Sequence, residues 1–104
     1  MPAVGILYAA SEALLDTQSS VLWKEVDEGW IRFDPHAGET HLLAPVTRFI
    51  LDQLSHDGTA LSEAALIHVV LEEEPDADPG ECQGQVRSAL NALLEARLIR
   101  AVTH

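Results

Sequence analysis

Hydrophobic and polar positions follow two different periods along the chain, and the period changes at Pro45. Before Pro45, three short runs rich in β-branched and aromatic residues (VLWKEV, GWIRFD and ETHLL) are separated by the turn sequences DEG and DPHAG. Alternation with a period of two is typical of half-buried strands, and Gly, Pro and Asp favour tight turns. The segment 21–43 is therefore predicted to form a three-stranded antiparallel meander. Within its second strand, Trp30 and Arg32 should lie on one face, and Ile31 and Phe33 on the other.

After Pro45 the apolar residues recur at spacings of three and four, which indicates amphipathic helices. Pro45 suits the first position of a helix that should run to about Leu54, with Gly58 as its left-handed cap. Ser62 is placed as the N-cap of a second helix. The predicted buried face of this second helix is Leu66, Ile67, Val70 and Leu71.

A third helix is predicted from Pro79 to about Arg97. Asp78, Pro79 and Glu81 fit its N-cap, N1 and N3 positions. Its predicted apolar stripe consists of Cys82, Val86, Ala89, Leu90, Leu93 and Leu94. The following LIRAV is predicted to be a last strand or an extended tail.

The first 20 residues show no clean period. Residues 6–8 (ILY) are suited to a strand and SEALLD to a helical turn, so this segment stays unassigned, as an extension that pairs with another chain or drapes over the domain. Two regions are predicted: 1–20, an N-terminal extension, and 21–104, a winged-helix domain. The expected fold class is α+β, in which a three-stranded antiparallel meander packs on a three-helix bundle with a winged helix-turn-helix-like arrangement.

The chain is strongly acidic, with 17 Asp and Glu against 6 Lys and Arg and a formal net charge of -11. Nucleic-acid-binding proteins cluster cations against phosphates, so no nucleic acid partner is expected. The acidic balance serves solubility or attracts a basic partner. No apolar run is long enough to span a membrane and no basic flank marks a secretory signal, so the protein is expected in the cytoplasm, with no membrane partner. The six cations are scattered singly: Lys24, Arg32, Arg48, Arg87, Arg97 and Arg100.

No residue pattern indicates catalysis or a metal site. His36 and His41 could meet across a turn but lack a third ligand, and EEEPDADPGE lacks the ligand spacing of a calcium loop. Cys82 lies on an apolar helical stripe, which is typical of a buried small hydrophobe. We therefore expect no enzyme activity, no cofactor and no metal. Trp23, Trp30 and Phe33 are expected to fill the core. The hairpin has apolar side chains on both faces, however, so one face could be partly exposed for a partner.

Taken in order, the segments WKEVDEGWIRFDPHAGETHLLAPVTRFILDQLSHDG, LSEAAL and VRSALNALLEARLIRAV resemble the PqqD-like family over residues 21–102. These small domains are named for a pyrroloquinoline quinone biosynthesis protein and are known as recognition elements for ribosomally made, modified peptides. The sequence is most similar to the subgroup encoded beside HPr kinase-related proteins. Members of that subgroup share a first-strand Trp, a D/N-P-x-x-G turn, a THLL strand and a final helix that ends in G/R-L-I.

The resemblance implies a winged-helix-like fold and a non-catalytic adaptor that presents a precursor to a peptide-modifying enzyme. It implies that a leader peptide adds as a strand to the edge of the third strand and lies against the third helix, a recurring mode of peptide recognition. The implied ladder is Thr40, His41, Leu42 and Leu43, and the implied helix wall is Val86, Arg87, Leu90 and Leu94. Arg87 is either a partner for an acidic leader residue or simply solvated. The net charge favours basic or neutral leaders.

Two other functions compete with this interpretation. The same edge and groove could serve a scaffold or dimerisation subunit, including a homodimer, of a kinase-associated biosynthetic system. The helix-turn-helix pattern could belong to a transcription factor, but that function needs a basic recognition helix. Here Arg87 and Arg97 are opposed by Glu81 and Glu95.

Overall fold

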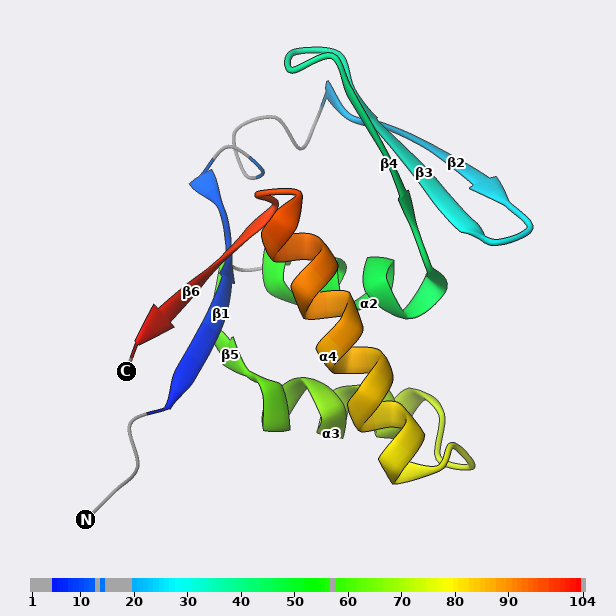
Figure 1. Cartoon of the computed structure of the whole chain (residues 1–104), viewed down its shortest axis with the longest axis vertical. Coiled ribbons are helices and arrows are strands. Elements are labelled where there is room, and N and C mark those ends of the chain that lie inside the picture. Colours follow the sequence, from blue (N-terminus) through cyan, green and yellow to red (C-terminus); the bar gives the residue numbers. More distant parts are fainter. Residues whose placement is uncertain (1–4, 13, 15–19, 57, 104) are drawn as a thin grey trace.

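The computed structural model describes residues 5–12, 14, 20–56 and 58–103 of the 104-residue chain. This part of the chain forms three helices and two three-stranded antiparallel sheets, which lie on different sides of the helices (Figure 1). The α+β class predicted from the sequence is confirmed. In chain order the elements are β1 (Ile6–Ala10), β2 (Leu22–Val26), β3 (Gly29–Asp34), β4 (Glu39–Leu43), α2 (Pro45–Ser55), β5 (Leu61–Ser62), α3 (Glu63–Glu73), α4 (Pro79–Glu95) and β6 (Ile99–Thr103).

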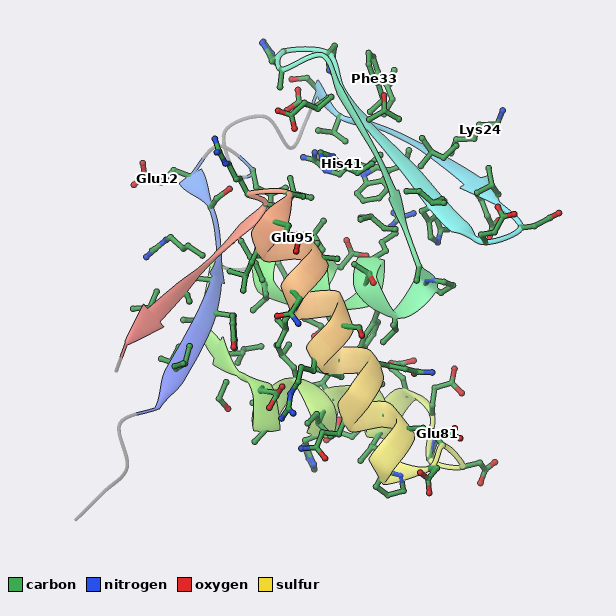
Figure 2. The ribbon with its side chains drawn as sticks, in the orientation of Figure 1. Glu12, Lys24, Phe33, His41, Glu81 and Glu95 are labelled. Carbon is green, nitrogen blue, oxygen red and sulfur yellow. The ribbon has the colours of Figure 1, made fainter. Side chains whose placement is uncertain are left out.

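The predicted meander forms one of the sheets, with strand order β2-β3-β4. Arg32 pairs with Trp23 on one side and with His41 on the other, so these three side chains share a face. That face is turned to the helices, because Arg32 is only 2% exposed. Phe33 lies on the opposite face, 37% exposed and directed away from the helices (Figure 2). The alternation predicted for β3 is therefore confirmed.

Glycines fix both turns of the meander. Gly29 has φ +144°, and a Cβ atom there would collide with the carbonyl oxygen of Leu43, so the start of β3 passes directly against the end of β4. Gly38 has φ +68° and donates its backbone N–H to the carbonyl oxygen of Asp34 at 2.8 Å. The Asp34 carboxylate also accepts from the backbone N–H of His36 at 2.9 Å, as expected of an Asx-type turn. These contacts hold the register between β3 and β4.

The helix starts follow the predicted capping. Pro45 occupies the first turn of α2. The Ser62 hydroxyl accepts from the backbone N–H of Ala65 at 3.1 Å at the start of α3. At the start of α4, the Asp78 carboxylate accepts from the backbone N–H of Glu81 at 3.0 Å. Side-chain oxygens thus satisfy amide groups that the first turns of α3 and α4 leave without a helical partner.

Helix α4 ends at Glu95, slightly before the predicted boundary, in a Schellman motif. The N–H of Leu98 donates to the carbonyl of Leu93, and the N–H of Arg97 donates to the carbonyl of Leu94, both at 3.0 Å. Arg97 therefore takes a left-handed conformation, with φ +61°, at a position that favours glycine. The chain then turns into β6, which confirms the strand alternative for LIRAV.

The second sheet has the order β5-β1-β6 and includes part of the first 20 residues, which show no clean period in the sequence. Strand β1 lies at its centre and pairs with β6 from Ile6↔Thr103 to Ala10↔Ile99. The backbone N–H of Ser11 extends this contact to the carbonyl of Leu98 at 3.0 Å. The possible helical turn in SEALLD falls partly outside the described residues.

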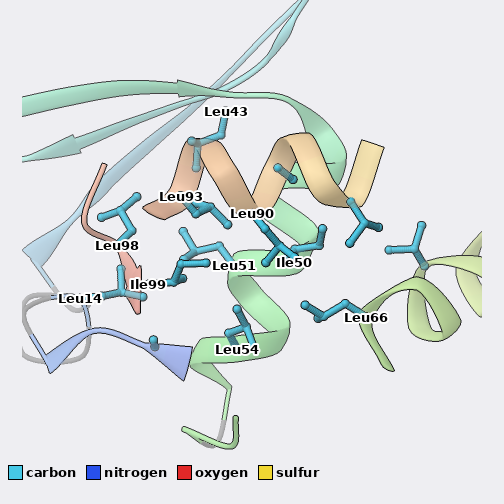
Figure 3. Packing of buried hydrophobic residues seen from close by; sticks show 14 of the residues in the cluster. Leu14, Leu43, Ile50, Leu51, Leu54, Leu66, Leu90, Leu93, Leu98 and Ile99 are labelled. Carbon is cyan, nitrogen blue, oxygen red and sulfur yellow. The ribbon is translucent and has the colours of Figure 1, made fainter. Parts of the chain in front are cut away.

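The hydrophobic core lies between the two sheets, where α2 and α4 cross (Figure 3). Ile50 and Leu54 of α2 and Leu93 of α4 are fully buried. The first sheet reaches this core through Leu43, which extends from the end of β4 towards α4. Burial of such side chains contributes about 1.5–3 kcal/mol each, so this packing fixes β4 relative to α4.

Arg48 of α2 attaches the meander to the helices. Its guanidinium carbon lies 4.2 Å from the ring centroid of Trp23 and 3.9 Å from that of Trp30. The two indole rings are in edge-to-face contact, with centroids 6.5 Å apart. Cation–π contacts of this kind are strongest when the cation is shielded from water. The two Trp residues therefore form part of the contact between the meander and α2.

Candidate functional site

The free edge of β4 is the first element of the candidate site. Within the described residues, β4 pairs only with β3 and is the outermost strand of its sheet. An edge strand leaves a row of main-chain N–H and C=O groups unpaired, which an added strand can satisfy. The described part of the N-terminal segment does not cover this edge, because β1 lies in the other sheet.

The pairing pattern identifies the outward-facing groups. The Asp34 carbonyl accepts from Gly38, so it points towards the β3–β4 turn. Main-chain groups of alternate residues point to alternate sides of an antiparallel strand, so Arg32 and Asp34 face β4. Their partners His41 and Glu39 must then face β3. This leaves Thr40 and Leu42 with N–H and C=O groups on the free edge.

The predicted ladder residues divide accordingly into two pairs. Thr40 and Leu42 are exposed, and the Leu42 side chain is 58% exposed on the outer face. Leu43 is 4% exposed and belongs to the core. His41 is partly buried, with its Nε2 atom 3.5 Å from the Glu39 carboxylate and its Nδ1 atom buried without a hydrogen-bond partner. The role of these four residues in peptide binding remains a prediction.

Most residues of the predicted helix wall on α4 are buried or partly buried. Val86 and Leu90 are 0% and 2% exposed, so they support α4 from within. Leu94 is partly buried and packs against the core. Arg87 is exposed and donates to both carboxylate oxygens of Glu63 at 3.1 and 3.2 Å. These hydrogen bonds raise the pKa of Arg87, and they occupy the side chain that the sequence offered for an acidic leader residue.

A cavity beside the end of β4 was not anticipated from the sequence. It has a volume of about 550 Å³ and lies among the start of α2, the end of α3 and the first turns of α4. In the sequence, the acidic run EEEPDADPGE resembles a calcium loop only superficially and gives no sign of a cavity. The periodic patterns of strands and helices each describe a single element, whereas this cavity is formed by three elements. Its lining residues are Ala44, Pro45, Val46, Phe49, Val70, Glu73, Glu74, Ala77, Cys82 and Gln85.

The His and Cys side chains that could bind a metal or act in catalysis make contacts within the fold instead. Across the described ranges, no group of three or more His, Cys, Asp or Glu side chains is arranged to hold a metal ion. The Cys82 thiol is buried, 4.0 Å from the carbonyl oxygen of Ile67. His68 pairs with Glu72 one turn along α3, at 2.8 Å. None of the helices in the described part of the chain is long and apolar enough to cross a membrane.

Comparison with known proteins identifies the class to which this fold and edge belong. The family model for coenzyme PQQ synthesis protein D (PqqD) matches residues 29–99. The chain therefore belongs to the PqqD family, and the resemblance seen in the sequence is confirmed at that level. No curated protein matches the sequence.

Two solved structures share the fold. One is TbiB1 in complex with the TbiA(beta) leader peptide, with a TM-score of 0.57 and 17% identity, covering 88% of this chain and 94% of that chain. The other is a lasso peptide synthetase B1 complexed with the leader peptide, with a TM-score of 0.55 and 17% identity, covering 89% of this chain and 96% of that chain. At this identity the likeness establishes the arrangement of helices and strands.

Proposed function

We propose that this chain is a non-catalytic adaptor that captures a precursor peptide by strand addition to the free edge of β4 and presents it to a modifying enzyme. The observation that carries the proposal is the unpaired edge at Thr40 and Leu42. Membership of the PqqD family supports it, as do the two similar structures, which both hold leader peptides. The peptide's main chain would supply most of the affinity, and its alternate side chains the selectivity.

The placement of α4 beside the end of β4 supports the same mode. A peptide strand on β4 would direct alternate side chains inward, towards α4, and outward, beside Leu42. Of the four residues of the predicted wall, Leu94 and Arg87 reach the surface, and the Arg87 guanidinium is held at Glu63, at the start of α3. Arg87 would have to leave Glu63 before it could hold an acidic residue of the peptide. We therefore expect the main-chain ladder and apolar contacts to outweigh that ion pair.

The finer assignments belong to the same proposal. We place the chain in the subgroup associated with HPr kinase-related proteins, with residues 21–104 as its winged-helix domain, acting in the cytoplasm. The motifs that favour this subgroup lie in elements that form as expected. They are Trp23 in β2, the DPHAG turn, the THLL residues of β4 and the Arg97-Leu98-Ile99 sequence after α4.

Hydrogen exchange tests the proposal directly. Short peptides encoded beside the gene would be synthesised and added to the 15N-labelled chain, and amide exchange would be followed by NMR. We expect the N–H groups of Thr40 and Leu42 to become protected on binding, while those of β2 at the opposite edge stay unchanged. Binding without protection of β4 would overturn strand addition at this edge.

A second candidate, a scaffold or dimerisation subunit, is favoured by the outer face of the meander. Leu22 is 62% exposed, Phe33 37% and Leu42 58%, and all three lie on this one face. Contiguous exposed apolar side chains mark interaction surfaces. Sedimentation of the chain alone and with its enzyme distinguishes the two candidates. If Leu22→Ser disrupts an assembly that forms without any peptide, the scaffold function holds.

A further inference from the structure

We propose that the cavity at the end of β4 is a subsite for a lysine or arginine side chain of the bound peptide. This inference rests on the proposed peptide-binding function and adds a chemical preference to it. The cavity's volume of about 550 Å³ falls within the usual range of about 300–1,000 Å³ for ligand pockets. Its chemistry is divided between an apolar floor and an acidic rim.

The floor suits the aliphatic stem of a long side chain. Val46 and Phe49 come from α2, Val70 from α3 and Cys82 from α4. Val70 and Cys82 are nearly inaccessible, at 6% and 2% exposure, so they form the base of the cavity. Lys and Arg side chains bury their methylene groups against such surfaces while the charged end stays at the polar boundary.

The rim suits a positive charge. Glu73 and Glu74 line the cavity at the end of α3, and neither forms an ion pair with any described residue. A helix C-terminus carries partial negative charge, and α3 has no basic residue in its last turn. The negative charges of Glu73 and Glu74 therefore repel each other and the partial negative charge at the end of α3. A cation from outside would relieve both repulsions, and none of the chain's six Lys and Arg residues lines the cavity.

The position of the cavity connects it to the proposed peptide path. Ala44 and Pro45, which follow β4 directly, form part of the lining. A strand on β4 that extends past Leu43 therefore reaches the cavity without a change of surface. The apolar floor offers no oxygen ligands, so an organic cation with an aliphatic stem suits the site better than a metal ion does.

Small side-chain mimics test the subsite without requiring strand addition. The 15N-labelled full chain would be titrated with Nα-acetyl-arginine methylamide and, separately, with the uncharged Nα-acetyl-norleucine methylamide. We expect the arginine probe to shift the amide signals of Phe49, Ala77 and Gln85 and to bind more tightly than the norleucine probe. In the double variant Glu73→Gln/Glu74→Gln, that preference should fall by about three- to tenfold, because two partly exposed ion pairs are lost.

A matched variant controls for net charge. Glu12→Gln/Glu95→Gln removes the same two charges from exposed positions outside the cavity lining, and Figure 2 shows Glu95 at the opposite end of α4 from Glu81. It should keep the arginine preference. Equal binding of the two probes, shifts confined to other surfaces, or an equal loss in both double variants would each overturn the subsite. If the probe results hold but no peptide protects β4, the proposed strand addition fails and the cation-binding cavity stands.

Discussion

Proline substitution at Thr40 or Leu42 should weaken peptide binding while leaving the fold intact. The N–H groups of these two residues point away from β3, so proline removes a donor from the free edge and none from the β3–β4 ladder. Both residues are exposed, and proline is tolerated in edge strands at such positions. The perturbation is therefore confined to the surface at which the peptide is proposed to pair.

The magnitude follows from the hydrogen bonds lost. A main-chain hydrogen bond contributes about 1 kcal/mol net, which corresponds to about a fivefold change in Kd. Thr40→Pro and Leu42→Pro should each raise the Kd about fivefold. The double variant should raise it about 25-fold, if the two losses add.

Isothermal titration calorimetry with a peptide that binds the native chain would measure these changes. Glu25→Pro is the matched control, because Glu25 is exposed on β2, the other edge strand of the same sheet. In the alternating pattern of the β2–β3 pairing, the N–H of Glu25 also points away from β3. All the variants should keep their melting temperatures within a few degrees of the native chain. Unchanged affinity in Thr40→Pro and Leu42→Pro, or an equal loss in Glu25→Pro, would refute strand addition to β4.

Three further substitutions test how the edge is held in place, each by urea denaturation. Gly29→Ala should lower the unfolding free energy by about 2–3 kcal/mol, because its φ is +144° and the new Cβ meets the Leu43 carbonyl; a loss within error would contradict this contact. Arg97→Gly should raise it by about 0.5–1 kcal/mol by relieving a left-handed φ of +61°, whereas a decrease would show that the Arg side chain matters more. Arg48→Ala should lower it by about 1–2 kcal/mol through lost contacts with the two indole rings, and equal losses in Arg48→Lys and Arg48→Ala would argue against a cation–π contribution.

Local patterns were sufficient to predict β2, β3, β4 and the three helices, but not the two-residue strand β5. The alternation in WIRFD, the caps at Ser62 and Asp78, and the proline at the start of α2 each act within a few residues, so they can be inferred from the sequence. Strand β1 could not be predicted in the same way. Its partner β6 lies about 90 residues away, and pairing between distant segments leaves no periodic signal in either of them.

The candidate site shows the same limit. The resemblance implied a ladder along residues 40–43, but only the pairing in the structure separates Thr40 and Leu42 at the free edge from the rest, and the burial of the helix wall did not follow from the sequence. Val86 and Leu90 have the apolar character expected of a binding groove, yet the same character places them in the core once α2 packs against α4. The cavity beside Glu73 required the relative positions of three helices, which no short motif encodes.

The pairing of Ile6 with Thr103 has a practical consequence for engineering. It brings the beginning and the end of the described chain together on the β1–β6 side, away from the meander (Figure 1). A short linker between these positions, with new termini opened in the exposed turn at Gly38, should give a circular permutant that still folds. Reporter domains attached next to Ile6 or Thr103 should lie on the β1–β6 side and leave the free edge of β4 accessible.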